Sequence, residues 1–174
     1  MLPYYFLLFA IAARFLPHAG SFNFTPVAAA LLFFGARMSR KQLWIPVALL
    51  ATSDVLISHF VYGYPLSASD LVTWTWYAAI VLLGSLLASN ASTLRVVGAS
   101  LMASLSFFAV SNFAVWAVWN MYPKTLAGLA ECYTMAIPFF RNTVASDLLF
   151  SGAFFGLAAL LPQLARKAQR PIAD

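Results

Sequence analysis

Four ionisable side chains lie in or beside long apolar runs of this sequence: Arg14, Asp54, Arg141 and Asp147. An ionisable group inside the hydrocarbon core of a membrane costs about 3 kcal/mol or more, so each one calls for a partner, a ligand or a role in topology. The chain of 174 residues contains only ten Lys and Arg and five Asp and Glu, and 63% of its residues are hydrophobic. This composition is typical of an integral membrane protein.

Two roles are open for Asp54, one functional and one structural. It lies near the middle of the apolar run 43–62, with Ser58 on the same helical face and His59 nearer the outer end. As a functional group it could hold a proton, a cation or a polar group of a ligand. As a structural group it would pair with Arg14 or cap a broken helix, and we favour the structural pairing.

Asn112, Trp116 and Trp119 follow one another at helical spacing in the apolar run 96–121, so they share a face. An Asn inside a span either bonds helices together or donates to a ligand. Trp116 would offer that ligand a stacking surface, and its replacement by Ala is expected to weaken binding while leaving the fold intact. Other Trp and Tyr residues gather near the expected outer ends of the runs 43–62, 72–88 and 96–121, where they would form an interfacial belt or a stacking pocket for a flat ligand. They are Tyr62, Tyr64, Trp74, Trp76, Tyr77 and Tyr122.

The stretch 131–147 combines charged, aromatic and small polar residues. Arg141 is expected on the outer side, where it could clamp an anionic group or pair with Asp147 or Glu131. Residues that commonly begin helices, such as Thr143, precede Asp147 closely. Asp147 is therefore predicted to stabilise the positive end of the last helix dipole.

Pairs of small residues at i, i+4 allow helix backbones to approach closely. Three such pairs are predicted to serve packing inside the bundle or docking of a partner: Gly84–Ala88, Ala99–Ala103 and Gly152–Gly156.

The elements that must position these residues are predicted to be six membrane-spanning helices. They cover about 2–17, 25–36, 43–62, 72–88, 96–121 and 147–161, and the segment 122–146 is expected to lie in the interface or to re-enter the bundle. The whole chain, 1–174, is then one all-α transmembrane domain. Little sequence remains for a soluble catalytic domain, and the sequence has no phosphate-binding loop motif.

Lys and Arg residues in the loops predict the orientation. With the N-terminus in the cytoplasm, seven basic residues lie inside: Arg37, Arg40, Lys41, Arg95, Arg166, Lys167 and Arg170. Only Lys124 and Arg141 lie in outside loops, and Arg14 lies near the outer end of the first span. Both termini are therefore predicted to be cytoplasmic.

Several function classes receive no support from the residues. The basic residues are scattered between spans and form no basic face, so nucleic-acid binding is not expected. His18 and His59 are isolated, without a metal-ligand spacing or a second carboxylate nearby. We expect neither enzyme activity nor a metal or other cofactor, and an enzyme using Asp54 and His59 is the least favoured reading.

Several motifs resemble a bacterial family of small membrane proteins described as transport proteins. They are Arg14-Phe15-Leu16-Pro17-His18, Phe22-Asn23-Phe24-Thr25-Pro26-Val27-Ala28-Ala29, Phe34-Gly35-Ala36, Ser53-Asp54, Ser111-Asn112 with Trp116, Tyr133 to Asp147, and Phe155-Gly156. That family is similar to the S components of energy-coupling-factor (ECF) vitamin transporters.

The resemblance implies an S-component-like bundle of six helices, with a solute site near the outer face closed by the first and fifth loops. On this sequence those loops contain Phe22 and Asn23, and Tyr122 through Asn142. S components dock on a transmembrane partner through an Ala-x-x-x-Ala pattern on the first helix, whereas Ala10 is followed here by Arg14. Docking on another face and function without an ATPase module both stay open.

The sequence thus predicts a multi-pass protein of the bacterial inner membrane that binds or moves a small organic solute such as a vitamin or its precursor. Its partners would be the lipid bilayer, the solute and, in one version, a transmembrane coupling subunit with ATPases. The alternative is an accessory or assembly subunit of a larger membrane complex with no transport role. The candidate ligand-binding residues are Arg14, Asn23, Asp54, Asn112, Trp116, Trp119, Tyr133, Arg141 and Asn142.

Overall fold

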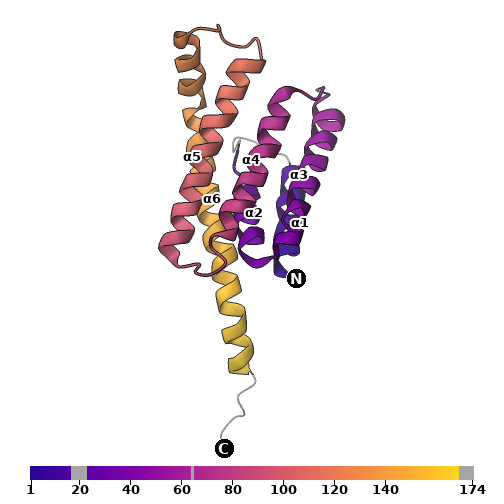
Figure 1. Cartoon of the computed structure of the whole chain (residues 1–174), viewed down its shortest axis with the longest axis vertical. Helices are drawn as coiled ribbons and strands as arrows, with labels where there is room; N and C mark the ends of the chain where they lie inside the picture. Colours follow the sequence, from indigo (N-terminus) through magenta and orange to yellow (C-terminus); the bar gives the residue numbers. More distant parts are fainter. Residues whose placement is uncertain (17–22, 64, 169–174) are drawn as a thin grey trace, which may run out of the picture.

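A computed structural model of the chain describes residues 1–16, 23–63 and 65–168, and the elements in this part are all helical. The six α-helices are, in chain order, α1 (Leu2–Arg14), α2 (Val27–Arg37), α3 (Trp44–Leu56), α4 (Ala68–Ser85), α5 (Thr93–Val118) and α6 (Leu126–Ala168) (Figure 1). A 3₁₀ helix, η1 (Arg40–Gln42), precedes α3, and a π-helix, η2 (Ile57–Tyr62), continues it. The predicted all-α fold is confirmed.

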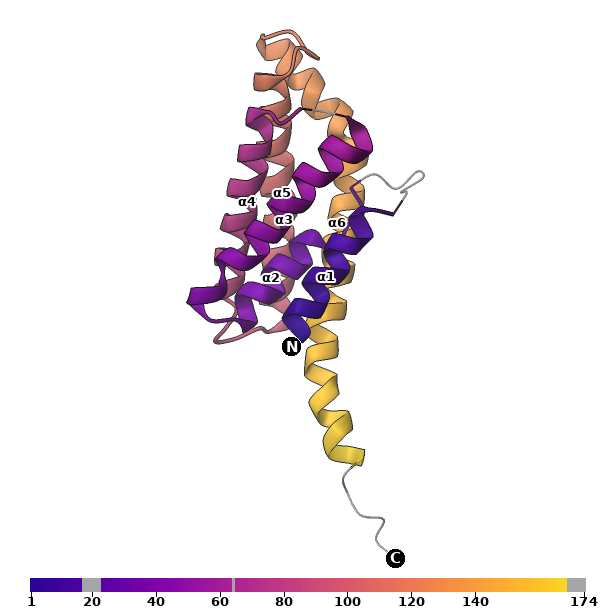
Figure 2. The ribbon, with the colours of Figure 1, turned by 90° about the vertical axis from the view of Figure 1, so that its right-hand side faces the viewer.

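Among the described residues, three helical stretches are long and apolar enough to cross a membrane: Arg40–Tyr62, Thr93–Val118 and Leu126–Gln163. Helices α1 and α2 are also apolar but shorter. Helix α6 has 43 residues and is therefore about 65 Å long, roughly twice the thickness of a hydrocarbon core. Its C-terminal turns project beyond the rest of the bundle, at the end where α1 begins (Figure 2).

Local sequence explains several helix ends. Pro3 lies in the first turn of α1, where a missing N–H costs no helical hydrogen bond. At the start of α4 the backbone N–H of Ser67 donates to Asp70 Oδ2 at 2.7 Å, as one half of a capping box. Gly63 ends η2 in the left-handed conformation, with φ 68°, which a glycine adopts without strain.

The core of the bundle is built around α2. Every residue from Val27 to Ala36 is buried, as expected for a helix that is apolar on all sides. Aromatic residues extend this core toward α1 and α6: the Phe6 and Phe154 rings stack with centroids 4.1 Å apart. Phe33 is fully packed beside them.

Helices α2 and α4 approach each other closely at two glycines. A Cβ added at Gly35 would lie 2.1 Å from the Val81 carbonyl oxygen, and one added at Gly84 would lie 2.4 Å from that of Leu32. The predicted packing role of Gly84 therefore agrees with the structure. At Gly152 and Gly156 an added Cβ would meet no atom of the described residues within 4 Å, so internal packing does not explain that pair.

The prediction for the end of the chain needs a correction. The structure continues through residues 126–168 as one helix, with Pro138 inside it, so a helix start at Asp147 is wrong. The cap-forming residue types before Asp147 bond within the helix instead. Thr143 Oγ1 donates to the Phe139 carbonyl at 3.1 Å, and Ser146 Oγ donates to the Thr143 carbonyl at 2.9 Å.

Candidate functional site

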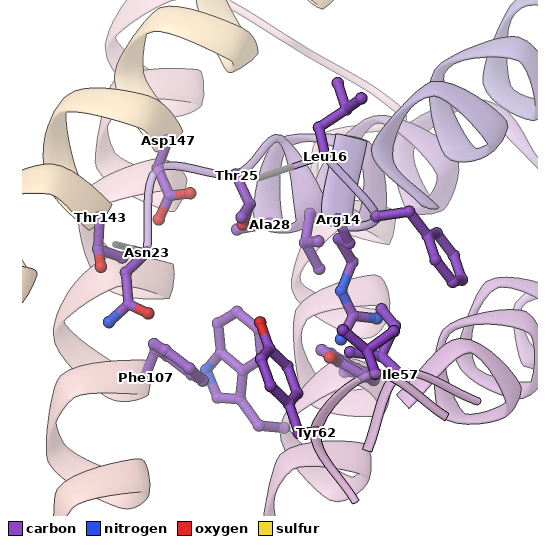
Figure 3. Close-up of a pocket in the computed structure, with 15 residues that line it drawn as sticks. Arg14, Leu16, Asn23, Thr25, Ala28, Ile57, Tyr62, Phe107, Thr143 and Asp147 are labelled. Carbon is purple, nitrogen blue, oxygen red and sulfur yellow. The ribbon is translucent and has the colours of Figure 1, made fainter. Parts of the chain in front are cut away.

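A cavity of about 590 Å³ lies among the helices, in the part of the bundle where α1 ends and α2 begins. Figure 3 shows side chains from several helices pointing into it. The lining residues are Arg14, Phe15, Leu16, Asn23, Thr25, Val27, Ala28, Ile57, Val61, Tyr62, Trp76, Tyr77, Phe107, Thr143 and Asp147. The site therefore combines charged, amide, hydroxyl and aromatic groups from α1, the segment before α2, η2, α4, α5 and α6, and α2 adds two apolar residues.

Arg14, which is paired with Asp54, lines one side of the cavity. Arg14, the last residue of α1, makes an ion pair with the Oδ1 atom of Asp54 on α3, and its other terminal nitrogen donates to Ser53 Oγ at 2.6 Å. Trp74 Nε1 donates to Asp54 Oδ2 at 2.9 Å, and the Tyr77 hydroxyl donates to Oδ1 at 3.4 Å. The carboxylate is thus held by three side chains. The predicted pairing of Asp54 with Arg14 is present.

Four aromatic residues of the lining, Tyr62, Trp76, Tyr77 and Phe107, form what we call the aromatic wall. The ring of Trp76 lies 4.8 Å from that of Phe107 and 5.8 Å from that of Tyr77, measured between centroids. Trp76 Nε1 donates to Ser106 Oγ at 3.0 Å, which orients the indole. Flat, rigid surfaces of this kind suit an apolar or aromatic ligand body.

Asp147 lies on the side opposite Arg14 (Figure 3). Asp147 is only 3% exposed, and Ser104 Oγ on α5 donates to its Oδ2 atom at 2.6 Å. Thr143, one turn earlier on α6, and Asn23 lie beside it (Figure 3). Asn23 has φ 62°, a conformation that Asn tolerates better than most residues. This polar side of the cavity is built from α5, α6 and the segment before α2.

The structure brings some of the predicted ligand-binding residues together. Arg14 and Asn23 line the cavity, whereas Asp54 is outside the lining and reaches the site only through its ion pair with Arg14. Asn112 and Asn23 line a smaller neighbouring pocket of about 60 Å³. The side-chain amide of Asn112 donates to the Phe108 carbonyl at 2.8 Å.

Three of the predicted aromatic and polar groups tie other parts of the chain together, away from the cavity lining. Trp116 Nε1 donates to the Pro123 carbonyl at 2.9 Å and Trp119 Nε1 to Ser69 Oγ at 3.2 Å. The Tyr133 hydroxyl donates to the Ala109 carbonyl at 2.6 Å. These contacts give the three residues a structural explanation.

The remaining predicted residues lie elsewhere on α6 or outside the described chain. Arg141 is exposed and makes no ion pair with any residue that the structure describes, so the predicted pairing with Asp147 or Glu131 is not formed. Asn142 is partly buried and lies outside the cavity lining. Phe22 lies outside the described residues.

Among the polar and aromatic lining residues, the sequence analysis named Tyr62, Trp76 and Tyr77 only as members of a belt or a pocket wall, and it did not include Phe107, Thr143 or Asp147 among the ligand-binding candidates. Asp147 carried a usable signal, because it is an acidic residue followed by a long apolar run. Phe107 carried none, because it is one of 16 Phe residues in the chain and no neighbouring pattern sets it apart. In the described ranges, no group of three or more His, Cys, Asp or Glu residues could hold a metal ion.

Comparison with known proteins adds a family but no function. The searches of curated proteins and of solved structures return no match for this chain. A family of unknown function, DUF6580, matches residues 1–170, which is nearly the whole sequence. The chain belongs to this family of unknown function, DUF6580.

Proposed function

We propose that this protein is a bacterial inner-membrane transport protein that binds a small organic solute in the cavity. The observation that carries the proposal is the cavity itself, about 590 Å³ in volume, with a charged pair on one side, a buried carboxylate on the other and the aromatic wall between them. Small-molecule sites are typically 300–1,000 Å³ in size, largely apolar and supplied with a few polar groups that fix orientation.

The proposed membrane arrangement has six spans and both termini in the cytoplasm. It is supported by the excess of Lys and Arg in the loops assigned to the inside. The bundle agrees with an even number of crossings, because α1 begins at the end of the bundle where α6 finishes (Figure 1). In this orientation the cavity lies toward the outer side, since Arg14 is at the far end of α1.

The resemblance to ECF S components is consistent with this position, because their solute sites also lie near the outer face. The energy source would be an ion gradient or a transmembrane coupling subunit with ATPases. Native mass spectrometry of the protein released from a gentle detergent tests the proposal. We expect a bound small molecule that is not a lipid; a spectrum with lipid adducts alone would count against solute binding.

Phe107→Ala is expected to reduce the fraction of protein carrying that molecule about 3–10-fold, because it removes one face of the aromatic wall. Phe113→Ala is the matched control, since Phe113 is on the same helix but is 52% exposed and does not line the cavity. The bound fraction is measured by native mass spectrometry of equal amounts of each variant. Equal losses in the two variants would exclude a specific role for the aromatic wall.

The alternative, an accessory subunit of a larger membrane complex, is favoured by one observation. An added Cβ at Gly152 or Gly156 meets no described atom within 4 Å, so another protein's helix could approach α6 there. The same mass spectrum distinguishes the two functions. A spectrum that contains a stoichiometric partner protein and no bound small molecule would support the accessory role.

A further inference from the structure

The charges around the cavity do not balance within the described chain. Arg14 contributes one positive charge, and Asp54 and Asp147 contribute one negative charge each when ionised. Because Arg14 and Asp54 form an ion pair, their charges offset each other locally. Asp147 is the group without a counter-charge among the described residues, and a cationic solute in the cavity would supply one.

Arg14 already has an anionic partner inside the protein. Its guanidinium already contacts the Asp54 carboxylate and the Ser53 hydroxyl. Trp74 and Tyr77 donate to the same carboxylate and so hold it toward α4. An anion entering this side would compete with a buried carboxylate that is already in place.

Asp147 differs from Asp54 in its partners. An ionised carboxylate can accept about four hydrogen bonds, but within the described residues Asp147 has one, from Ser104 to Oδ2 at 2.6 Å. Ser104 is fully buried on α5, so this side of the carboxylate is closed. The carboxylate points into the cavity (Figure 3). Its other oxygen therefore faces the space that a solute would fill.

We propose that the solute is an organic monocation, with its positive nitrogen at Asp147 and a flat apolar body against the aromatic wall. This assignment rests on the proposed solute-binding function and adds the class of solute. A buried carboxylate is stabilised by a cation that also donates hydrogen bonds to it. An aromatic face nearby adds cation–π attraction.

The groups beside Asp147 fit a protonated amine. An ammonium group has three donors, and the neighbouring Thr143 hydroxyl and Asn23 amide supply oxygen acceptors on the same side of the cavity (Figure 3). Thr143 Oγ1 donates its own hydrogen to the Phe139 carbonyl, which leaves its lone pairs available. A metal ion fits less well, because no cluster of three acidic, His or Cys side chains is present in the described chain.

The test uses 2-phenylethylamine and 2-phenylethanol as matched probes, because they share a flat body and differ in the charged nitrogen. Binding to the purified full-length protein at neutral pH is measured by isothermal titration calorimetry. We expect the amine to bind the wild type at least about tenfold more tightly than the alcohol, as charge-assisted hydrogen bonds predict. Asp147→Asn should abolish this preference, whereas Glu131→Gln, which removes an exposed carboxylate outside the site, should retain it.

The wild-type comparison needs no variant, so it decides the question even if Asp147→Asn fails to fold. Equal affinities of the amine and the alcohol for the wild type would overturn the cationic assignment, with Asp147 then holding a proton, but would leave solute binding supported. An amine preference that persists in Asp147→Asn would place the cation elsewhere and also overturn the assignment. Binding of neither probe at millimolar concentration would count against the cavity as a solute site and thus against both proposals.

Discussion

Asp54→Asn should lower the free energy of unfolding by about 3–5 kcal/mol, the largest loss we expect from a single polar substitution in this chain. The side chains of Arg14 and Asp54 are only 16% and 11% exposed. Removing the carboxylate charge leaves the guanidinium buried without its counter-charge. The measurement is unfolding of the purified protein in detergent, by heating or by titration with SDS. Glu131→Gln is the control, because neutralising this exposed carboxylate should leave the stability unchanged.

A double substitution separates the pair from its surroundings. Asp54→Asn combined with Arg14→Met removes both charges, so the double variant should be more stable than the sum of the single losses predicts. Strictly additive losses would mean that Asp54 stabilises the bundle through Trp74 and Tyr77, its other two hydrogen-bond partners, rather than through Arg14.

Helix positions followed well from the sequence because hydrophobic runs of membrane proteins are long and their ends carry local signals. The expected span 43–62 corresponds to α3 and η2, and the expected span 96–121 to α5, which begins and ends three residues earlier. Asp54 was identifiable as a group needing a partner because a charge inside an apolar run is costly wherever the other helices lie. Arg14, at the expected outer end of the first predicted span, was the nearest candidate partner.

The wrong predictions concern segments whose local sequence permits two structures of similar free energy. Thr143 and Ser146 can either cap a helix or bond back to the preceding turn, and the same local sequence permits both. The structure continues the helix, so Asp147 lies within α6 and its carboxylate meets α5 and the cavity. Trp116 shows the converse problem, because helical spacing placed it on the face of Asn112 but could not indicate that its indole would bond to Pro123.

For the lining residues on α4 and α5 the reason is different: the sequence grouped Trp76 and Tyr77 with other aromatic residues but could not decide between an interfacial belt and a pocket wall, and Phe107 had no distinguishing pattern. Their role depends on which helix lies opposite, and this depends on how closely the backbones approach. The contact between α2 and α4 is set by Gly35 and Gly84, whose small size lets carbonyl groups of the facing helix come within 2.1–2.4 Å of the position of a Cβ. The position of α4 in turn places Trp76 and Tyr77 in the aromatic wall.

Gly84→Ala should therefore destabilise the protein by about 3 kcal/mol, although Ala is the better helix former. Its Cβ would meet the backbone of Leu32 on α2, which is buried on all sides and has no room to move away. Gly98→Ala on α5 is the matched control, because that glycine is exposed and an added Cβ meets nothing within 4 Å. The stability of the Gly98→Ala protein should therefore be unchanged or slightly raised. Thermal unfolding in detergent measures both variants.

Gly84→Ala should also weaken binding of the amine probe, since separating α2 from α4 moves Ala28 away from Trp76 and Tyr77 across the cavity. The two effects share one cause, so Gly35→Ala, on the other helix of the same contact, should reproduce both. Loss of stability with wild-type probe affinity would show that the cavity keeps its shape when the helices separate. The glycine contact would then stabilise the bundle without positioning the aromatic wall.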